Sequence, residues 1–155
     1  MHSKNNQLTQ LAILIALSIV LGKFVSIPTP TGFLTLLDAG IYFTAFLLGP
    51  NQGMVVGGVS AFLIDLLSGY PNWMIFSLFA HGGQGYFAGL KGKKRPFGLA
   101  LASLVMILIY FITSGFMYGF GAAIAGLLGN TFQNFFGMLV GYSLFKAYQK
   151  YRGNK

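Results

Sequence analysis

Cysteine and glutamate are absent from this sequence, and aspartate, histidine and tryptophan are rare among its 155 residues. Without cysteine there can be no disulfide, no thiol nucleophile and no cysteine-bound metal. Two aspartates and two histidines supply few other ligands, so we expect neither a metal nor a cofactor. No phosphate-binding loop is present either, because the glycines of His81-Gly-Gly-Gln-Gly85 lack the lysine that such a loop needs.

Charged residues make up only 8% of the chain, whereas a soluble globular domain carries about 25%. Hydrophobic residues reach 55% and the mean hydropathy is +0.69. So few charges cannot cover a surface that faces water. We therefore predict an all-α integral membrane protein, with residues 1–155 forming a single transmembrane domain.

Long apolar runs without period-two alternation favour helices over barrel strands. A spanning helix needs about 20 mostly apolar residues. The N-terminal run has no small-residue cleavage site after it, so we interpret it as a retained first span. The sequence predicts six transmembrane helices, over residues 8–25, 36–49, 53–69, 74–91, 97–118 and 122–147.

The net charge of +8 comes from short basic clusters between apolar runs. Such clusters are typical of cytoplasmic loops and do not form the basic face that nucleic acid requires. Six spans with both termini in the cytoplasm place three clusters on that side; Lys23 alone would lie outside, at a helix end. The clusters are Lys4, then Lys91-Gly-Lys-Lys-Arg95, then Lys146, Lys150, Arg152 and Lys155.

Small residues recur at four-residue spacing, which lets helices approach closely in lipid. For most glycine pairs (Gly53/Gly57, Gly85/Gly89, Gly115/Gly119 and Gly137/Gly141) we expect packing inside the bundle. Ala12-Ile-Leu-Ile-Ala16 in the first span leaves two interpretations open. It packs inside the bundle, or it presents a smooth surface to another membrane protein.

The rare polar residues collect toward the predicted outer end, near the segments 26–33 and 68–73, which we expect to be loops. Each has a plain structural explanation, such as helix capping by Asp38 or membrane anchoring by Trp73. Together, however, an acid, an imidazole, carboxamides and aromatic rings are what a pocket for a flat polar ring compound contains. The candidate substrate-binding residues are Asp38, Tyr42, Asp65, Asn72, Trp73, His81, Gln84, Asn130 and Asn134.

Over nearly its whole length the chain resembles the substrate-binding S components of energy-coupling factor (ECF) vitamin transporters. Ala12-x-x-x-Ala16 resembles the alanine motif that docks onto the coupling subunit, and the six short spans match the family fold. Phe33-Leu-Thr-Leu-Leu-Asp38-Ala-Gly40 and Asp65-Leu-Leu-Ser-Gly-Tyr-Pro-Asn-Trp73 resemble the group assigned to hydroxymethylpyrimidine, a thiamine precursor, or to pyridoxine.

The resemblance implies a high-affinity binding subunit in a bacterial plasma membrane that takes a B-vitamin compound from outside. It also implies a transmembrane coupling subunit and two ATPase subunits as partners, which would hydrolyse ATP, so the chain itself would not be an enzyme. Other interpretations stay open: an S component for another vitamin such as pantothenate or folate, a self-sufficient small transporter, or a membrane scaffold or small enzyme.

Overall fold

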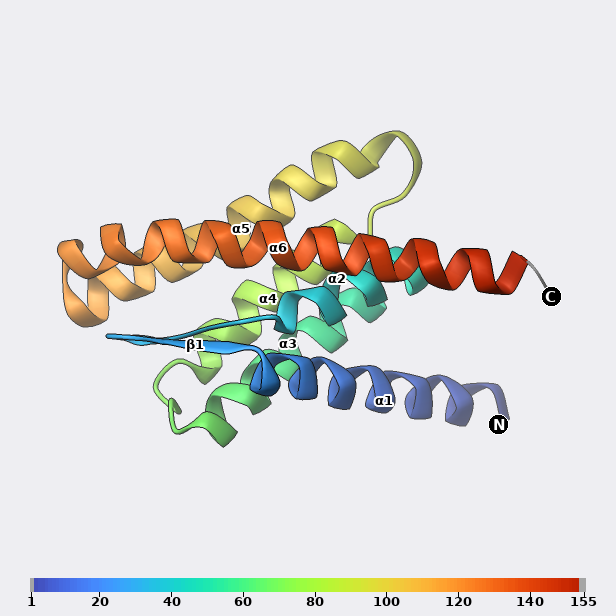
Figure 1. Cartoon of the computed structure of the whole chain (residues 1–155), viewed down its shortest axis with the longest axis horizontal. Helices are drawn as coiled ribbons and strands as arrows, with labels where there is room; N and C mark the ends of the chain where they lie inside the picture. Colours follow the sequence, from blue (N-terminus) through green and yellow to red (C-terminus); the bar gives the residue numbers. More distant parts are fainter. Residues whose placement is uncertain (1, 154–155) are drawn as a thin grey trace.

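The computed structural model describes residues 2–153, with side chains described for 5–153. Within this range the chain is a bundle of six α-helices with one short 3-10 helix and one β-hairpin, and its two ends lie on the same side (Figure 1). The helices lie where the sequence predicts them. They are α1 (His2–Phe24), α2 (Leu37–Leu48), α3 (Pro50–Ser68), α4 (Met74–Ala88), η1 (Gly92–Lys94), α5 (Arg95–Tyr118) and α6 (Phe120–Gly153), and the strands are β1 (Ser26–Thr29) and β2 (Gly32–Thr35).

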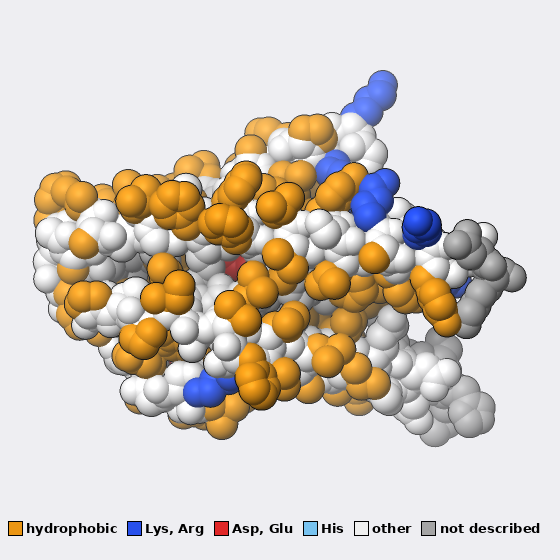
Figure 2. Space-filling view, viewed as in Figure 1, with side chains coloured by type: hydrophobic (Ala, Val, Ile, Leu, Met, Phe, Trp, Pro, Cys, Tyr) orange, Lys and Arg blue, Asp and Glu red, His pale blue; other side chains and the backbone are white. Residues whose placement is uncertain are grey.

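Four stretches of helix are long and apolar enough to cross a membrane: Asn5–Phe24, Pro50–Ser68, Gly92–Tyr118 and Phe120–Gly153. Large apolar side chains such as Ile112, Phe116 and Leu128 are exposed on these helices. Apolar side chains are also spread along the whole length of the face in Figure 2, which is the surface expected of a protein solvated by lipid.

Helix α2 occupies the centre of the bundle. It contacts α1, α3, α4 and α6, and most of its side chains are buried. Its 12 residues extend about 18 Å, which is well short of the hydrocarbon core of a bilayer. Because neighbouring helices surround it, α2 can carry polar side chains such as Asp38 and Tyr42 without exposing them to lipid.

Close packing through glycine is confirmed for three of the four predicted pairs. A Cβ atom on Gly85 would collide with the backbone of Gly53, and one on Gly57 would collide with the carbonyl of His81. On α6, a Cβ on Gly137 would collide with Asp38. The fourth pair differs: Gly119 has a φ of 93° and ends α5 at the tight turn into α6, with no packed neighbour.

Replacing Gly85 with Ala is expected to destabilise the protein by about 1–3 kcal/mol, because the added methyl group overpacks rigid backbone. Gly121→Ala is the matched control, since a Cβ there meets open space. Thermal unfolding of the detergent-solubilised protein measures both. Equal melting temperatures for the two variants would contradict close packing of α3 against α4.

The segment after α1, predicted as a loop over residues 26–33, is instead part of an antiparallel hairpin, so the expectation of a plain loop here is wrong, whereas the all-α class holds for the bundle. The pairs run from Ser26↔Thr35 to Thr29↔Gly32, which leaves a two-residue turn. Pro28 and Pro30 favoured a loop at the sequence level. Both strands of a two-stranded sheet are edges, however, and an edge strand tolerates proline where no donor is needed.

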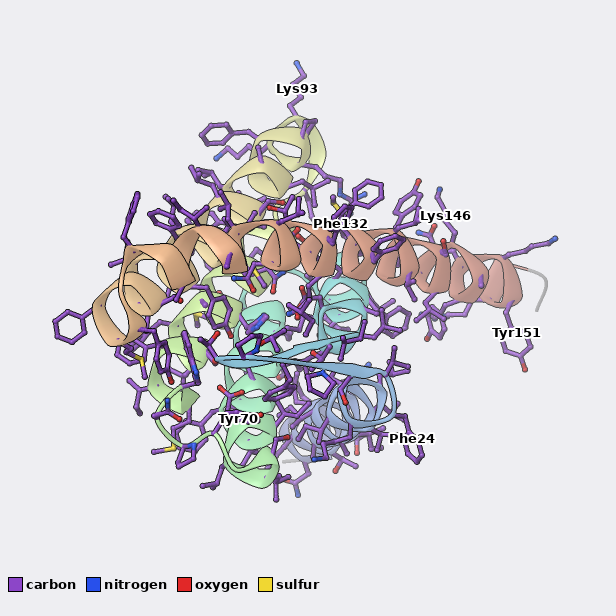
Figure 3. All side chains as sticks on the ribbon, turned by 60° about the vertical axis from the view of Figure 1, so that its left-hand side comes forward. Phe24, Tyr70, Lys93, Phe132, Lys146 and Tyr151 are labelled. Atoms are coloured by element: carbon purple, nitrogen blue, oxygen red, sulfur yellow. The ribbon has the colours of Figure 1, made fainter. Side chains whose placement is uncertain are left out.

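The bundle has two chemically different ends. The hairpin, the α3–α4 loop and the α5–α6 turn lie at one end, whereas the chain termini and the α4–α5 loop lie at the other (Figure 1). Lys and Arg side chains gather mainly toward the end with the termini (Figure 2), and Lys93 and Lys146 point away from the bundle (Figure 3). The side chain of Lys4 and all of Lys155 lie outside the described residues.

Candidate functional site

A cavity of about 340 Å³ lies beneath the hairpin, between α3, α4, α5 and α6. Its volume is near the lower limit of ligand pockets, which measure about 300–1,000 Å³. The hairpin turn forms one wall and the first half of α6 forms another. The lining residues are Thr29, Pro30, Thr31, Gly32, Phe33, Leu34, Asp65, Trp73, Ser77, Tyr110, Ser114, Ala122, Ala125, Gly126, Gly129, Asn130 and Gln133.

Asp65 brings the only carboxylate to this lining. It lies in the last turn of α3, which ends at Gly69 with a φ of 83°. The amide of Tyr70 donates to the carbonyl of Asp65 (2.9 Å) and that of Gly69 to Leu66 (3.4 Å), the hydrogen-bond pattern of a Schellman cap. The cap turns the chain away and leaves the Asp65 side chain at the cavity. Its Oδ2 atom is buried and has no hydrogen-bond partner among the described residues.

Trp73 joins the cavity wall to the hairpin. It stands at the start of α4, is 7% exposed, and its indole Nε1–H donates to the carbonyl of Thr31 in the hairpin turn (2.8 Å). Its ring lies 5.7 Å from that of Tyr110 and 5.8 Å from that of Tyr118, centroid to centroid. Trp73 is therefore a buried wall residue that holds the turn in place, rather than a lipid-facing anchor.

A second aromatic contact closes the hairpin side. The rings of Phe33 on β2 and Tyr70 on the α3–α4 loop lie 5.1 Å apart. Figure 3 shows Tyr70 beside the hairpin, with Phe24 pointing away from the bundle. The hairpin therefore packs on the α3–α4 loop at its turn and along β2.

The hydroxyl-bearing residues of the lining were not named from the sequence; they are Thr29 and Thr31 on the hairpin and Ser77, Tyr110 and Ser114 on the helices. The hydroxyls of Ser77 and Tyr110 are hydrogen-bonded at 2.7 Å across α4 and α5. The signal that could have found the three on the helices is helical spacing. Ser77 lies one turn before His81 on α4, and Tyr110 and Ser114 are four residues apart, so each pair shares a face.

The polar side chains of Asn130, Gln133 and Asn134 on α6 lie in two different environments. Asn130 and Gln133 line the cavity. Asn134, one residue on, is 2% exposed and points into the core, where its Oδ1 accepts hydrogen bonds from Tyr42 (2.8 Å) and Ser103 (3.0 Å). The carboxamide of Asn134 therefore ties α6 to α2 and α5 behind the cavity wall.

A buried polar cluster lies behind the cavity and contains the other acid. Asp38 Oδ1 is 3.2 Å from His81 Nδ1, and that nitrogen is 2.8 Å from Gln84 Oε1. Asp38 and Gln84 are 0% exposed and His81 is 3% exposed. Asp38 therefore pairs with the imidazole instead of capping α2, whose first turn it occupies.

The nine candidate residues thus fall into three groups. Asp65, Trp73 and Asn130 line the cavity. Asn72 is exposed, and its amide donates to the hydroxyl of Tyr118 (2.7 Å). The buried cluster brings together Asp38, Tyr42, His81, Gln84 and Asn134, none of which lines the cavity.

The two alanines predicted as a docking motif, Ala12 and Ala16, are both exposed. The opposite face of α1 is the packed one, with Leu14, Ser18 and Gly22 buried. Of the two interpretations left open by the sequence, packing inside the bundle is therefore wrong for these alanines.

The lining combines one carboxylate, hydroxyls, carboxamides and aromatic rings, and it includes no Lys, Arg or His. Within residues 2–153 no three His, Asp, Glu or Cys side chains come together as a metal site would require. This chemistry suits an uncharged or cationic ring compound with hydrogen-bond donors. The fold and cavity together define a membrane-embedded protein that binds a small molecule.

Comparisons with known proteins identify the family. The family model for the S component of ECF-type riboflavin transporters matches residues 2–150. The thiamine precursor transporter HmpT of Lactococcus lactis subsp. cremoris (strain MG1363) is 48% identical over 151 residues, covering 95% of this chain and 88% of HmpT. An uncharacterised protein of Pyrococcus woesei is 32% identical over 126 residues, covering 77% of this chain and 84% of its own length.

A solved structure of the S component of a bacterial ECF transporter shares the fold. It superimposes with a TM-score of 0.75 at 22% identity, covering 96% of this chain and 98% of the other. The chain therefore belongs to the S-component family of ECF transporters. Its function is that of a membrane-embedded, substrate-binding transporter subunit.

Proposed function

We propose that this chain binds hydroxymethylpyrimidine, a precursor of thiamine, at the cavity beneath the hairpin. The observation that carries the proposal is the buried, unpartnered Oδ2 of Asp65 at a small cavity walled by Trp73, Tyr110 and Phe33. Hydroxymethylpyrimidine is a flat ring that bears an amino group. Its amine would donate to Asp65 while its ring lies between aromatic side chains.

Two supports distinguish this ligand from riboflavin, which the family model names. HmpT, a thiamine precursor transporter, is identical to this chain at 48% of the aligned positions. The one carboxylate of the cavity lining, Asp65, matches the amino group of the pyrimidine, a group that riboflavin lacks. Pyridoxine is also a single ring, but it lacks the amino group that would engage Asp65.

The buried cluster would contribute indirectly. The pair Asp38–His81 and the bonds from Tyr42 and Ser103 to Asn134 connect α2, α4, α5 and α6 behind the cavity. Polar networks whose members are bonded in this way hold helices in one arrangement. We propose that these residues shape the cavity wall, and that Asp65, Trp73 and Asn130 contact the ligand.

Transport would require partners. With six spans and both termini in the cytoplasm, the basic end faces inward and the hairpin faces outward, as the positive-inside rule requires. The exposed alanines on α1 would dock onto a transmembrane coupling subunit, and two ATPase subunits would drive release. The localisation would be a bacterial plasma membrane.

The proposed ligand is tested by titrating the purified protein with hydroxymethylpyrimidine, pyridoxine and riboflavin. Trp73 is the only tryptophan of the chain and lines the cavity, so its fluorescence reports binding directly. Hydroxymethylpyrimidine is expected to bind at least about tenfold more tightly than pyridoxine, because only the first can donate an amine to Asp65. Tighter binding of riboflavin would reassign the substrate.

A further inference from the structure

Gln133 lines the cavity and also makes two hydrogen bonds through its side-chain amide. Its Oε1 accepts a hydrogen bond from the backbone N–H of Thr35 (2.8 Å), and its Nε2 donates to Asp38 Oδ1 (3.4 Å). A backbone N–H can only donate, and an ionised carboxylate can only accept. The two partners therefore fix the orientation of the Gln133 amide.

The hairpin is consequently held at both of its ends by cavity residues. Trp73 holds the turn through the carbonyl of Thr31, and Gln133 holds the end of β2 through Thr35. Asp38, the other partner of Gln133, is itself bonded to His81. The two side chains that hold the hairpin, Trp73 and Gln133, therefore both line the cavity, where a ligand would contact them.

The amide nitrogen of Gln133 has two hydrogens, and Asp38 accepts one of them. We infer that Gln133 is a positioning residue that couples ligand binding to seating of the hairpin, and that its second N–H is a donor for a ligand acceptor such as a ring nitrogen. A ligand in the cavity would then be hydrogen-bonded at two points, to an acceptor on Asp65 and to a donor on Gln133. The donor part of this inference rests on the proposed function; the hairpin part does not.

Two substitutions separate the two parts. Gln133→Met keeps the length of the side chain and removes both polar atoms. Gln133→Glu keeps an oxygen that can accept from Thr35; its other oxygen lies beside Asp38, so the two carboxyl groups share one proton and no hydrogen is left to donate to a ligand. Gln149 lies exposed near the other end of α6, so Gln149→Met and Gln149→Glu are matched controls.

Hydrogen–deuterium exchange of segment 26–36 tests the hairpin part without any ligand. Exchange in Gln133→Met is expected to be about tenfold faster than in Gln149→Met, because the N–H of Thr35 loses its acceptor. Gln133→Glu should restore slow exchange. Equal exchange in Gln133→Met and Gln149→Met would overturn the coupling role. If Gln133→Met does not fold, the comparison uses the glutamate variants. Faster exchange in Gln133→Glu than in Gln149→Glu would then overturn the coupling role.

Titration with hydroxymethylpyrimidine, followed by Trp73 fluorescence, tests the donor part. Gln133→Glu is expected to bind about tenfold more weakly than Gln149→Glu while its hairpin stays protected. Unchanged affinity would show that the second N–H of Gln133 does not donate to the ligand. If the unsubstituted protein itself does not bind this probe, the proposed substrate fails, and the exchange experiment still decides whether Gln133 seats the hairpin.

Discussion

Replacing Asp65 with Asn is expected to weaken binding of hydroxymethylpyrimidine by about a hundredfold. Losing one charged partner of a buried hydrogen bond costs about 2–5 kcal/mol, and 1.4 kcal/mol corresponds to a factor of ten. Asp65 is 6% exposed and is the only carboxylate of the cavity lining, so no neighbouring acid can replace it. Fluorescence titration of Trp73 measures the change.

The thermal stability of Asp65→Asn, unlike its affinity for the ligand, is not expected to decrease. The buried Oδ2 of Asp65 has no partner among the described residues, so neutralising the carboxylate in the empty protein should leave the melting temperature unchanged or raise it. An analogue of hydroxymethylpyrimidine without its amino group provides the matched comparison. It should bind the unsubstituted protein weakly and lose little further affinity in Asp65→Asn. An equal further loss for both ligands would show that Asp65 does not receive the amine.

The second large effect concerns transport and leaves binding unchanged. Ala12→Trp and Ala16→Trp are each expected to reduce ECF-dependent uptake to background, because a bulky ring on the exposed face of α1 prevents close approach of another helix. Affinity for the ligand should stay the same, since neither alanine lines the cavity. Uptake by vesicles that contain this chain with the coupling and ATPase subunits proposed for it measures the first effect.

Ala100→Trp is the control for this experiment. Ala100 is exposed on α5, a helix on a different part of the bundle surface, so its substitution should leave uptake intact. Isolation of the assembled complex gives the direct readout. If the complex forms normally with both α1 variants, the alanines face lipid and the docking surface lies elsewhere. Uptake by this chain alone in vesicles would indicate a self-sufficient transporter.

Much of the bundle could be predicted because lipid imposes simple constraints. Long apolar runs had to be helices, and Gly49-Pro50 had to end one helix and begin the next. The glycine pairs on α3, α4 and α6 predicted close contacts because little else drives helices together in a membrane. The hairpin could not be predicted, since Pro28 and Pro30 resemble a loop until Pro28 is seen to pair with Phe33 on β2 and Pro30 to lie in the turn.

The site could be predicted only in part, because the way the helices pack decides which of the polar side chains reach the cavity. Asp65 and Trp73 were placed at the outer end from the topology, and both line the cavity. Asp38 was also expected near the outer face, but the hairpin covers the start of α2 and Asp38 is buried against His81. Spacing on α6 put Asn130 and Asn134 together, whereas the rotation of the helix against α2 sends Asn134 into the core.

Tyr110 and Ser77 line the cavity but could not be assigned to it from the sequence. On helices rich in apolar and aromatic residues, a single hydroxyl carries no sequence signal of its own. Their shared position at the cavity depends on how α4 and α5 cross, which brings the two hydroxyls to 2.7 Å. The two helices are also close at Gly83 on α4, where a Cβ would lie 2.7 Å from Cγ1 of Val105 on α5.

The most direct test of the central claim is an experimental structure of the protein with hydroxymethylpyrimidine bound. We expect the ring in the cavity beneath the hairpin, its amine within hydrogen-bond distance of Asp65, and its faces against Trp73 and the aromatic wall. A ligand bound outside this cavity, or bound within it with Asp65 unengaged, would contradict the account.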